Sequence, residues 1–172
     1  MPTTPPITLT TDRLVLRPLE PRDADAFAAM NADPAVMEHF TTGPLDREAS
    51  DRMLATLRAD HLRHGFGLSA VERKADGAML GFTGIHYHRY YPDDVEIGWR
   101  LAAHAWGQGY ATEAATAWLE HAFTQLRLPR LISITVPENL RSIAVMRRLG
   151  FTLWEKARHE DLDLVVYARD AA

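Results

Sequence analysis

The chain has 172 residues, of which 47% are hydrophobic and 24% charged, and its formal net charge at pH 7 is -4. This length suits one domain with an ordinary core, and the composition argues against disorder. The sequence has no long apolar run and no basic segment followed by an apolar one at its start, so we expect a cytoplasmic protein without membrane contact. Its negative charge argues against nucleic-acid binding, which needs a basic surface.

The chain contains no cysteine. This excludes disulfides, zinc sites built on thiolates, iron–sulfur clusters and a cysteine nucleophile. Of the 19 basic residues only Lys74 and Lys156 are lysines, so guanidinium groups carry almost all of the positive charge.

The N-terminal half is predicted to begin with a short strand and continue as helices. We expect residues 1–10 to form a disordered lead-in, because three prolines fall within its first seven residues. Asp23 and Asp33 are candidate helix caps, and Gly65 is expected to end a helix. In chain order we predict a strand over 14–17, a helix over 22–30, a second helix start at 33–34 and a long helix over 46–64.

The second half changes to the two-residue period of strands. Asp76-Gly77 is a hairpin signal, and an aromatic and acidic loop is expected over 86–94. The predicted elements are strands over 66–70, 79–87 and 95–101, a helix over 112–126, a strand over 131–136, a helix over 139–149 and a strand over 162–168. This order, without repeats or linkers, predicts a single α/β domain over residues 11–170.

A turn rich in glycine, Trp106-Gly107-Gln108-Gly109-Tyr110-Ala111-Thr112, lies between a predicted strand and a predicted helix. Small residues let a ligand approach the backbone, and the N–H groups at a helix start attract anions. A phosphate or pyrophosphate is the expected ligand, although such a turn also serves simply to start a helix. A Walker loop would need lysine at Tyr110, and the dinucleotide fingerprint would need glycine at Thr112.

Several segments in the same order resemble the GCN5-related N-acetyltransferase (GNAT) superfamily, and within it the RimJ/RimL-like ribosomal-protein N-acetyltransferases. They cover 11–18, 95–99, 106–114, 139–142 and 149–151. Trp106 stands where the wider superfamily more often has glutamine or arginine, and we interpret it as a mark of this branch. The resemblance implies a mixed central sheet flanked by helices, with two parallel strands, here 95–101 and 131–136, splayed apart to form a cleft.

The resemblance also implies acetyl-CoA as co-substrate. It assigns the pyrophosphate to the glycine turn, and the pantetheine amides to the strand edge near Trp99 and Leu101. Arg147 is the chosen candidate for the 3′-phosphate among three arginines, although a solvated arginine face is the alternative. The residues of the turn expected to bind the co-substrate are Gly107, Gln108, Gly109, Tyr110, Ala111 and Thr112.

Acetyl transfer to an amine needs a base, because an amine titrates near 8 at a chain terminus and near 10.4 on a lysine. Glu96 is the expected base. It faces away from Ile97 and Trp99 on its strand, and the resemblance places an acid at this position, acting either directly or through a water. The alternative is a solvated strand residue, or a structural ion pair with Arg100 on the same strand face.

The departing thiolate needs a proton. Many family members supply it from a tyrosine, but the corresponding residue here is Met146, which cannot donate. Ser142 is expected to take this role, as the resemblance to the Rim-like branch implies. Asn139 lies one helical turn before it and is expected to bind pantetheine or the splayed backbone, or to cap the helix.

The acceptor is expected to contact four aromatic or imidazole side chains, Phe40, Tyr87, His88 and Tyr90. Acidic residues nearby, Asp93, Asp94 and Glu38, would suit a cationic acceptor stacked on these rings. The alternative for this region is a polar hairpin tip or a dimer contact.

Two histidine pairs, His61 with His64 and His86 with His88, have spacings that can chelate zinc. No third ligand is indicated, so we expect no metal. His86 or His88 is a better candidate for a substrate-pocket group or an alternate base.

These features predict direct transfer of acetyl from acetyl-CoA to a primary amine, either a protein N-terminus or a small amine. Without cysteine an acyl-cysteine relay is impossible, which leaves direct transfer or, as the alternative, an oxygen nucleophile. Direct transfer requires both substrates in one ternary complex. The alternative is an acyl-CoA-binding regulatory module with little catalysis. The identity of the acceptor, the choice between monomer and homodimer, and the use of other acyl-CoAs are left open.

Overall fold

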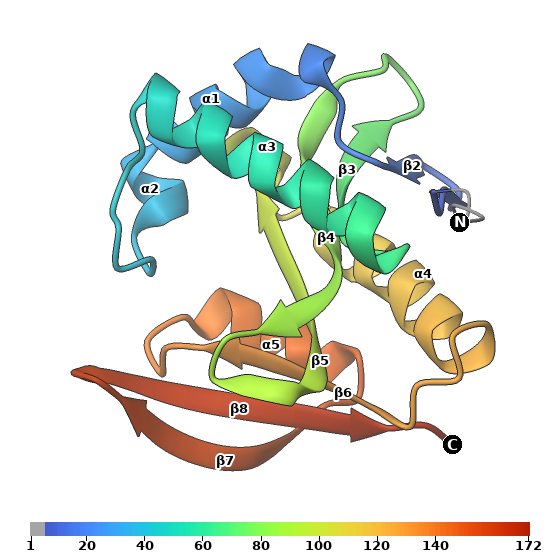
Figure 1. Cartoon of the computed structure of the whole chain (residues 1–172), viewed down its shortest axis with the longest axis vertical. Coiled ribbons are helices and arrows are strands. Elements are labelled where there is room, and N and C mark those ends of the chain that lie inside the picture. The colour runs from blue at the N-terminus through green and yellow to red at the C-terminus, as the bar shows by residue number, and fades with distance from the viewer. Residues whose placement is uncertain (1–5) are drawn as a thin grey trace.

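The computed structural model describes residues 6–172, which form an eight-stranded sheet of order β1-β2-β3-β4-β5-β6-β8-β7 flanked by helices (Figure 1). The strands are β1 (Leu9–Thr10), β2 (Leu14–Arg17), β3 (Leu68–Arg73), β4 (Met79–His88), β5 (Tyr91–Leu101), β6 (Arg130–Thr135), β7 (Thr152–His159) and β8 (Leu162–Asp170). The helices are α1 (Ala24–Ala32), α2 (Pro34–Met37), α3 (Arg47–His64), α4 (Tyr110–Thr124) and α5 (Leu140–Arg148), with 3₁₀ turns η1 (Pro21–Asp23) and η2 (Ala103–Ala105).

The central feature of the sheet is the pair β5 and β6. These two strands are parallel and share a single register pair, Glu96 with Ile132, whereas the other neighbouring strands are antiparallel. The predicted class, a mixed sheet with two parallel strands splayed apart, is therefore confirmed.

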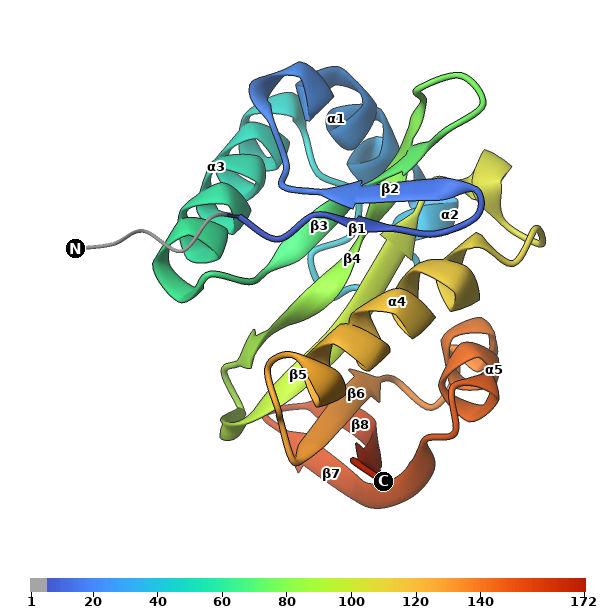
Figure 2. The same cartoon turned by 90° about the vertical axis from the view of Figure 1, so that its right-hand side faces the viewer.

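Two apolar clusters hold the helices on opposite faces of the sheet. Phe27 of α1 and Leu54 of α3 pack with Phe82 of β4 on one face. On the other face Trp118 of α4 and Met146 of α5 are fully buried against strands that include β5 and β6. Figure 2 shows α3 and α4 on different sides of the strands. Among residues 6–172, no helix combines the length and apolar character needed to cross a bilayer.

The helix boundaries follow local chemistry. Asp33 accepts a hydrogen bond from the N–H of Ala35, and Asp46 accepts one from Ala49, so both begin helices as capping residues. Gly65 ends α3 in the left-handed conformation at φ 76°.

The expected cap at Asp23 is wrong for α1, since its side chain makes no capping hydrogen bond to that helix. Its two oxygens instead accept hydrogen bonds from the guanidinium of Arg17, each at 2.8 Å, and one also accepts from the N–H of Glu20. Arg17 and Asp23 are both buried. Leaving the buried Arg17 cation without a carboxylate would cost more free energy than leaving the helix without a side-chain cap.

Several of the observed strands differ from the expected ones. Leu9–Thr10, which fell within the expected lead-in, pair with β2, while residues 1–5 lie outside the described part. The expected loop over 86–94 is mostly strand, because β4 continues to His88 and β5 begins at Tyr91. Strand β7 was not predicted, since most of its side chains are exposed and it shows no alternation of apolar and polar residues.

One buried histidine makes the stability of the fold depend on pH. His61 of α3 is 3% exposed, and neither of its ring nitrogens has a hydrogen-bond partner among the described residues. Burial disfavours the imidazolium and lowers the pKa of His61 below its ordinary value. As the pH falls through about 6.5, the unfolded chain therefore takes up a proton here before the folded protein does.

We expect the free energy of unfolding of His61→Leu to fall less than that of the wild type as the pH is lowered from about 7.5 to about 5. Denaturant titrations at several pH values measure this difference. His104→Leu is the matched control, because His104 is exposed on η2 and should leave the wild-type dependence unchanged. Identical pH dependence in His61→Leu and the wild type would contradict the assignment.

Candidate active site

The glycine turn presents unpaired backbone donors. Gly107 and Gly109 are left-handed, at φ 72° and φ 79°, and Gly109 immediately precedes α4. The first N–H groups of a helix have no acceptor within it, so those of Tyr110, Ala111 and Thr112 are available to a ligand. A Cβ built on Gly107 would meet no atom within 4 Å. Open space, free donors and the positive end of a helix dipole fit a phosphate group.

Arg13 of the segment before β2 holds this turn in place. Its Nη1 donates to the carbonyl of Gln108 at 2.9 Å, its Nε donates to Glu113 at 2.6 Å, and its guanidinium stacks 4.3 Å from the Tyr110 ring. Glu113 also accepts from Thr11 Oγ1. Burial raises the pKa of Glu113, but these hydrogen bonds lower it by more than burial raises it. The net shift of the pKa is downward, so the carboxylate form is stabilised.

Beside the turn, one edge of β5 is open. The Ile97 carbonyl accepts from Ser133 Oγ at 3.0 Å, and the Leu101 carbonyl accepts from Trp106 Nε1 at 2.9 Å, so neither is paired with a strand. Trp99 lies between them with the same orientation, because the N–H and C=O of alternate residues point to the same side of a strand. Its N–H and C=O therefore face the gap, where an extended amide chain could pair.

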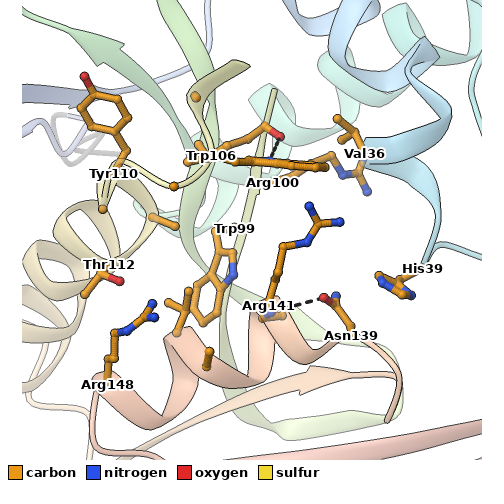
Figure 3. A pocket seen from close by; sticks show the side chains of 18 of the residues that line it. Val36, His39, Trp99, Arg100, Trp106, Tyr110, Thr112, Asn139, Arg141 and Arg148 are labelled. Carbon is orange, nitrogen blue, oxygen red and sulfur yellow. Dashed lines mark hydrogen bonds between the residues drawn. The ribbon is translucent and has the colours of Figure 1, made fainter. Parts of the chain in front are cut away.

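The turn and the open edge belong to one cleft of about 740 Å³. In Figure 3, Thr112 and Arg148 flank one end, Val36 and His39 flank the other, and Trp99 lies between. The expected site residues that line the cleft are Phe40, Trp99, Leu101, Gly107, Gly109, Tyr110, Ala111, Thr112, Asn139 and Ser142. Those absent from its wall are Gln108, Glu96, Arg147, Tyr87, His88 and Tyr90.

Asn139 caps α5. Its Oδ1 accepts from the N–H of Ser142 at 3.2 Å, and its Nδ2 donates to Thr135 Oγ1 at 3.0 Å. Ser142 takes part through its backbone, so this cap leaves the Ser142 hydroxyl available in the cleft wall.

Glu96 lies at the junction of β5 and β6 and is 7% exposed. Its Oε1 accepts from the N–H of Ile134 at 3.3 Å, and its Oε2 is 3.2 Å from His86 Nε2 and 3.9 Å from His88 Nε2. Its partners are thus two histidines and a backbone amide, whereas Arg100 bonds to Asn31.

The two histidines beside Glu96 differ in the direction of their pKa shifts. Burial lowers the pKa of His86, but the hydrogen bond and charge of Glu96 raise it by a larger amount, so the net shift of the pKa is upward. His86 Nδ1 lies 3.1 Å from the Tyr87 carbonyl, and a donor is needed there too. Burial dominates at His88 and lowers its pKa; His88 Nδ1 accepts from the Tyr90 N–H, which places the proton of the neutral ring on Nε2. The strand register, unknown from the sequence, creates this cluster.

The expected aromatic wall is only partly present. Tyr87 packs against His64 and Phe66, and Tyr90 stacks on His159 at 4.3 Å. The β4–β5 hairpin extends further than expected and carries both tyrosines to other surfaces.

The arginines of α5 also differ from the expectation. The Arg147 Nη2 is 3.4 Å from the Tyr167 hydroxyl, whereas Arg148 lines the cleft. Arg141 stacks 3.9 Å from the Trp106 ring, and its Nη2 lies 3.8 Å from Glu38. The arginine of this pair that faces the cleft is therefore Arg148, one position after the expected Arg147.

Comparisons with known proteins agree with this architecture. Residues 13–152 match the family model described as an acetyltransferase (GNAT) domain. Bacillus subtilis YkkB is 32% identical over 163 residues, covering 94% of each chain. The crystal structure of an acetyltransferase from Agrobacterium tumefaciens str. C58 is 34% identical with a TM-score of 0.83, covering 95% of this chain and 94% of that one. Mycobacterium smegmatis RimJ in complex with CoA-disulfide is 26% identical with a TM-score of 0.80, covering 99% and 90%.

The chain belongs to the GNAT acetyltransferase family and is an N-acetyltransferase. The similarity to RimJ is consistent with the RimJ/RimL-like branch. Members of the family use acetyl-CoA.

A matched glycine pair tests the turn. Gly107→Ala and Gly77→Ala both place a side chain at nearly the same positive φ, 72° and 71°, in open space, so each should lose about 1 kcal/mol or more of stability. Only Gly107 lines the cleft. We expect calorimetry to show acetyl-CoA binding weakened roughly tenfold or more in Gly107→Ala and unchanged in Gly77→Ala. Equal affinities in the two variants would exclude the turn as the phosphate site.

Proposed function

We propose that the protein transfers acetyl from acetyl-CoA directly to a primary amine. The observation that carries this proposal is the meeting of the glycine turn, the start of α4 and the open edge of β5 in one cleft. The turn and Arg148 suit the phosphates, and the peptide groups of Trp99 suit the pantetheine amides.

Acetyl-CoA supplies an acetyl group already activated as a thioester. The protein must therefore mainly remove a proton from the amine and donate one to the departing sulfur. Glu96 is the base of the proposal. Since it is nearly enclosed and absent from the cleft wall, a water is the better carrier of the amine proton to its Oε2. His86, at 3.2 Å from the same oxygen, holds that carboxylate in place.

Ser142 is the proposed acid. Ser142 lines the cleft near the start of α5, and its N–H donates to the side chain of Asn139. The hydroxyl can therefore donate to the departing sulfur and recover a proton from solvent without disturbing the helix.

Two conservative variants test these roles. Glu96→Gln keeps an oxygen for the Ile134 N–H but cannot accept the proton, so kcat should fall roughly a hundredfold or more, and most at low pH where the amine is protonated. Ser142→Ala keeps the helix cap, so kcat should fall while acetyl-CoA affinity stays within about twofold. Thiol release and calorimetry measure these quantities. Wild-type rates in both variants would contradict the roles.

The kinetic order separates direct transfer from a covalent relay. Since the chain has no cysteine, varying both substrates should give intersecting double-reciprocal lines typical of a ternary complex. Thiol release is assayed with peptides, small amines and polyamines. Parallel lines would overturn direct transfer. Acetyl-CoA binding without release for any amine would favour the alternative, an acyl-CoA-responsive module.

A further inference from the structure

Arg100 of β5 lies on the wall of the cleft on the side of α1, α2 and α3. Its guanidinium is 3.9 Å from the Phe40 ring and 5.2 Å from the Phe82 ring, and Figure 3 shows it beside Val36. Side chains alternate along a strand, so Arg100 projects from the same face of β5 as Glu96. This is the opposite end of the cleft from Thr112 and Arg148, where the phosphates of the co-substrate are proposed to bind.

The charge of Arg100 has no counter-ion among residues 6–172. Its Nη1 donates to the amide oxygen of Asn31 at 2.8 Å and lies 3.8 Å from the sulfur of Met53, while its Nε is enclosed without an acceptor. Burial lowers the pKa of Arg100 to about 10, so the group is still a cation at neutral pH. The buried Arg17, by contrast, is paired with Asp23 and Glu72. An unpaired, partly buried cation is costly unless an anion completes it.

The guanidinium is held in a fixed position. Asn31 is fully buried, and its Nδ2 donates to the hydroxyl of Ser50 at 3.0 Å, so a polar chain connects β5, α1 and α3. The rings of Phe40 and Phe82 pack against the guanidinium. Nη2 remains without an acceptor in the described chain. A group ordered in this way is prepared to bind a ligand with little loss of side-chain entropy.

The remaining charges of the cleft do not favour a polycation. Glu113 on the cleft wall is held by Arg13. Glu38 is absent from the wall and faces Arg141 at 3.8 Å. Asp93 and Asp94, which were expected to attract a cationic acceptor, are absent from the cleft wall. A polyamine would therefore meet the unopposed charge of Arg100.

We infer that the acceptor is an amine that also carries a carboxylate, and that Arg100 binds this carboxylate. The inference rests on the proposed function, since it specifies the acceptor of that same cleft. Guanidinium–carboxylate hydrogen bonds are short and strong, and the pair would neutralise a charge that the fold leaves uncompensated. Arg100 is thus a specificity-determining residue, four positions along β5 from the proposed base.

Matched acceptors test the carboxylate directly. A series of ω-amino acids from glycine to 6-aminohexanoate is compared with the corresponding ω-amino amides, in which only the charged group differs. We expect kcat/KM to be roughly tenfold to hundredfold higher for the acid of the best chain length than for its amide. The best length also measures the separation of amine and carboxylate in the site.

Variants connect that preference to one residue. Arg100→Gln should bring the ratio of acid to amide close to one, and Arg100→Lys should retain part of it because the charge remains. Arg148→Gln is the control, since it removes a cleft guanidinium at the other end and should leave the ratio unchanged. Thermal unfolding of each variant verifies that the fold persists, and acetyl-CoA calorimetry on the two Arg100 variants verifies that the co-substrate site persists. Arg148→Gln is compared at saturating acetyl-CoA, because Arg148 is proposed to bind the phosphates.

Three outcomes overturn the inference while acetyl transfer stands: amides are used as well as acids, the ratio survives in Arg100→Gln, or spermidine exceeds every amino acid. The proposed function fails in a different way. In that case no amine of either series, nor spermidine, releases thiol, and calorimetry shows no acetyl-CoA binding; the acceptor inference is then rejected with it.

Discussion

Hydrogen bonding between β5 and β6 ends after one register pair, and two side chains occupy the positions that a strand would otherwise fill. Ser133 Oγ donates to the Ile97 carbonyl, and Glu96 Oε1 accepts from the Ile134 N–H. Both atoms satisfy backbone groups that would be costly to leave unpaired. They therefore permit the strands to separate, and the open edge of β5 and the cleft depend on this separation. Glu96 is both part of this junction and the proposed base, so its substitution tests chemistry cleanly only when the replacement retains an acceptor.

The parts of the site that the sequence predicted are local ones. The left-handed glycines, the start of α4 and the cap at Asn139 each involve residues within a few positions, and their chemistry is visible in the order of residues. The strand pair at 95–101 and 131–136 was expected only through the resemblance, since apolar runs do not specify which strands stay apart. Strand β7 was missed because an exposed edge strand has little need of apolar alternation.

The parts that the sequence did not predict depend on distant contacts. Arg13 and Glu113 are separated by 100 positions, and only the folded sheet brings them together at the turn. The contact between His86 and Glu96 depends on the register of β4 against β5. Deciding which of Arg147 and Arg148 faces the cleft requires the rotational phase of α5, which changes by about 100° per residue. These three cases share one reason: the side chain involved is placed by packing, whereas its own neighbours in the sequence carry no signal of its partner.

The cations on the cleft wall have a consequence for the enzyme itself. Among the described residues that line the cleft, the permanently cationic ones are Arg100, Arg141 and Arg148. A guanidinium stays protonated and has no nucleophilic lone pair, so it can hold an anion beside a reactive thioester without being modified. The two lysines are elsewhere: Lys74 donates to the Thr11 carbonyl, and Lys156 is on the edge strand β7. Arginine at these positions cannot be acetylated as lysine can, so the charges proposed to bind the substrates are kept beside the thioester.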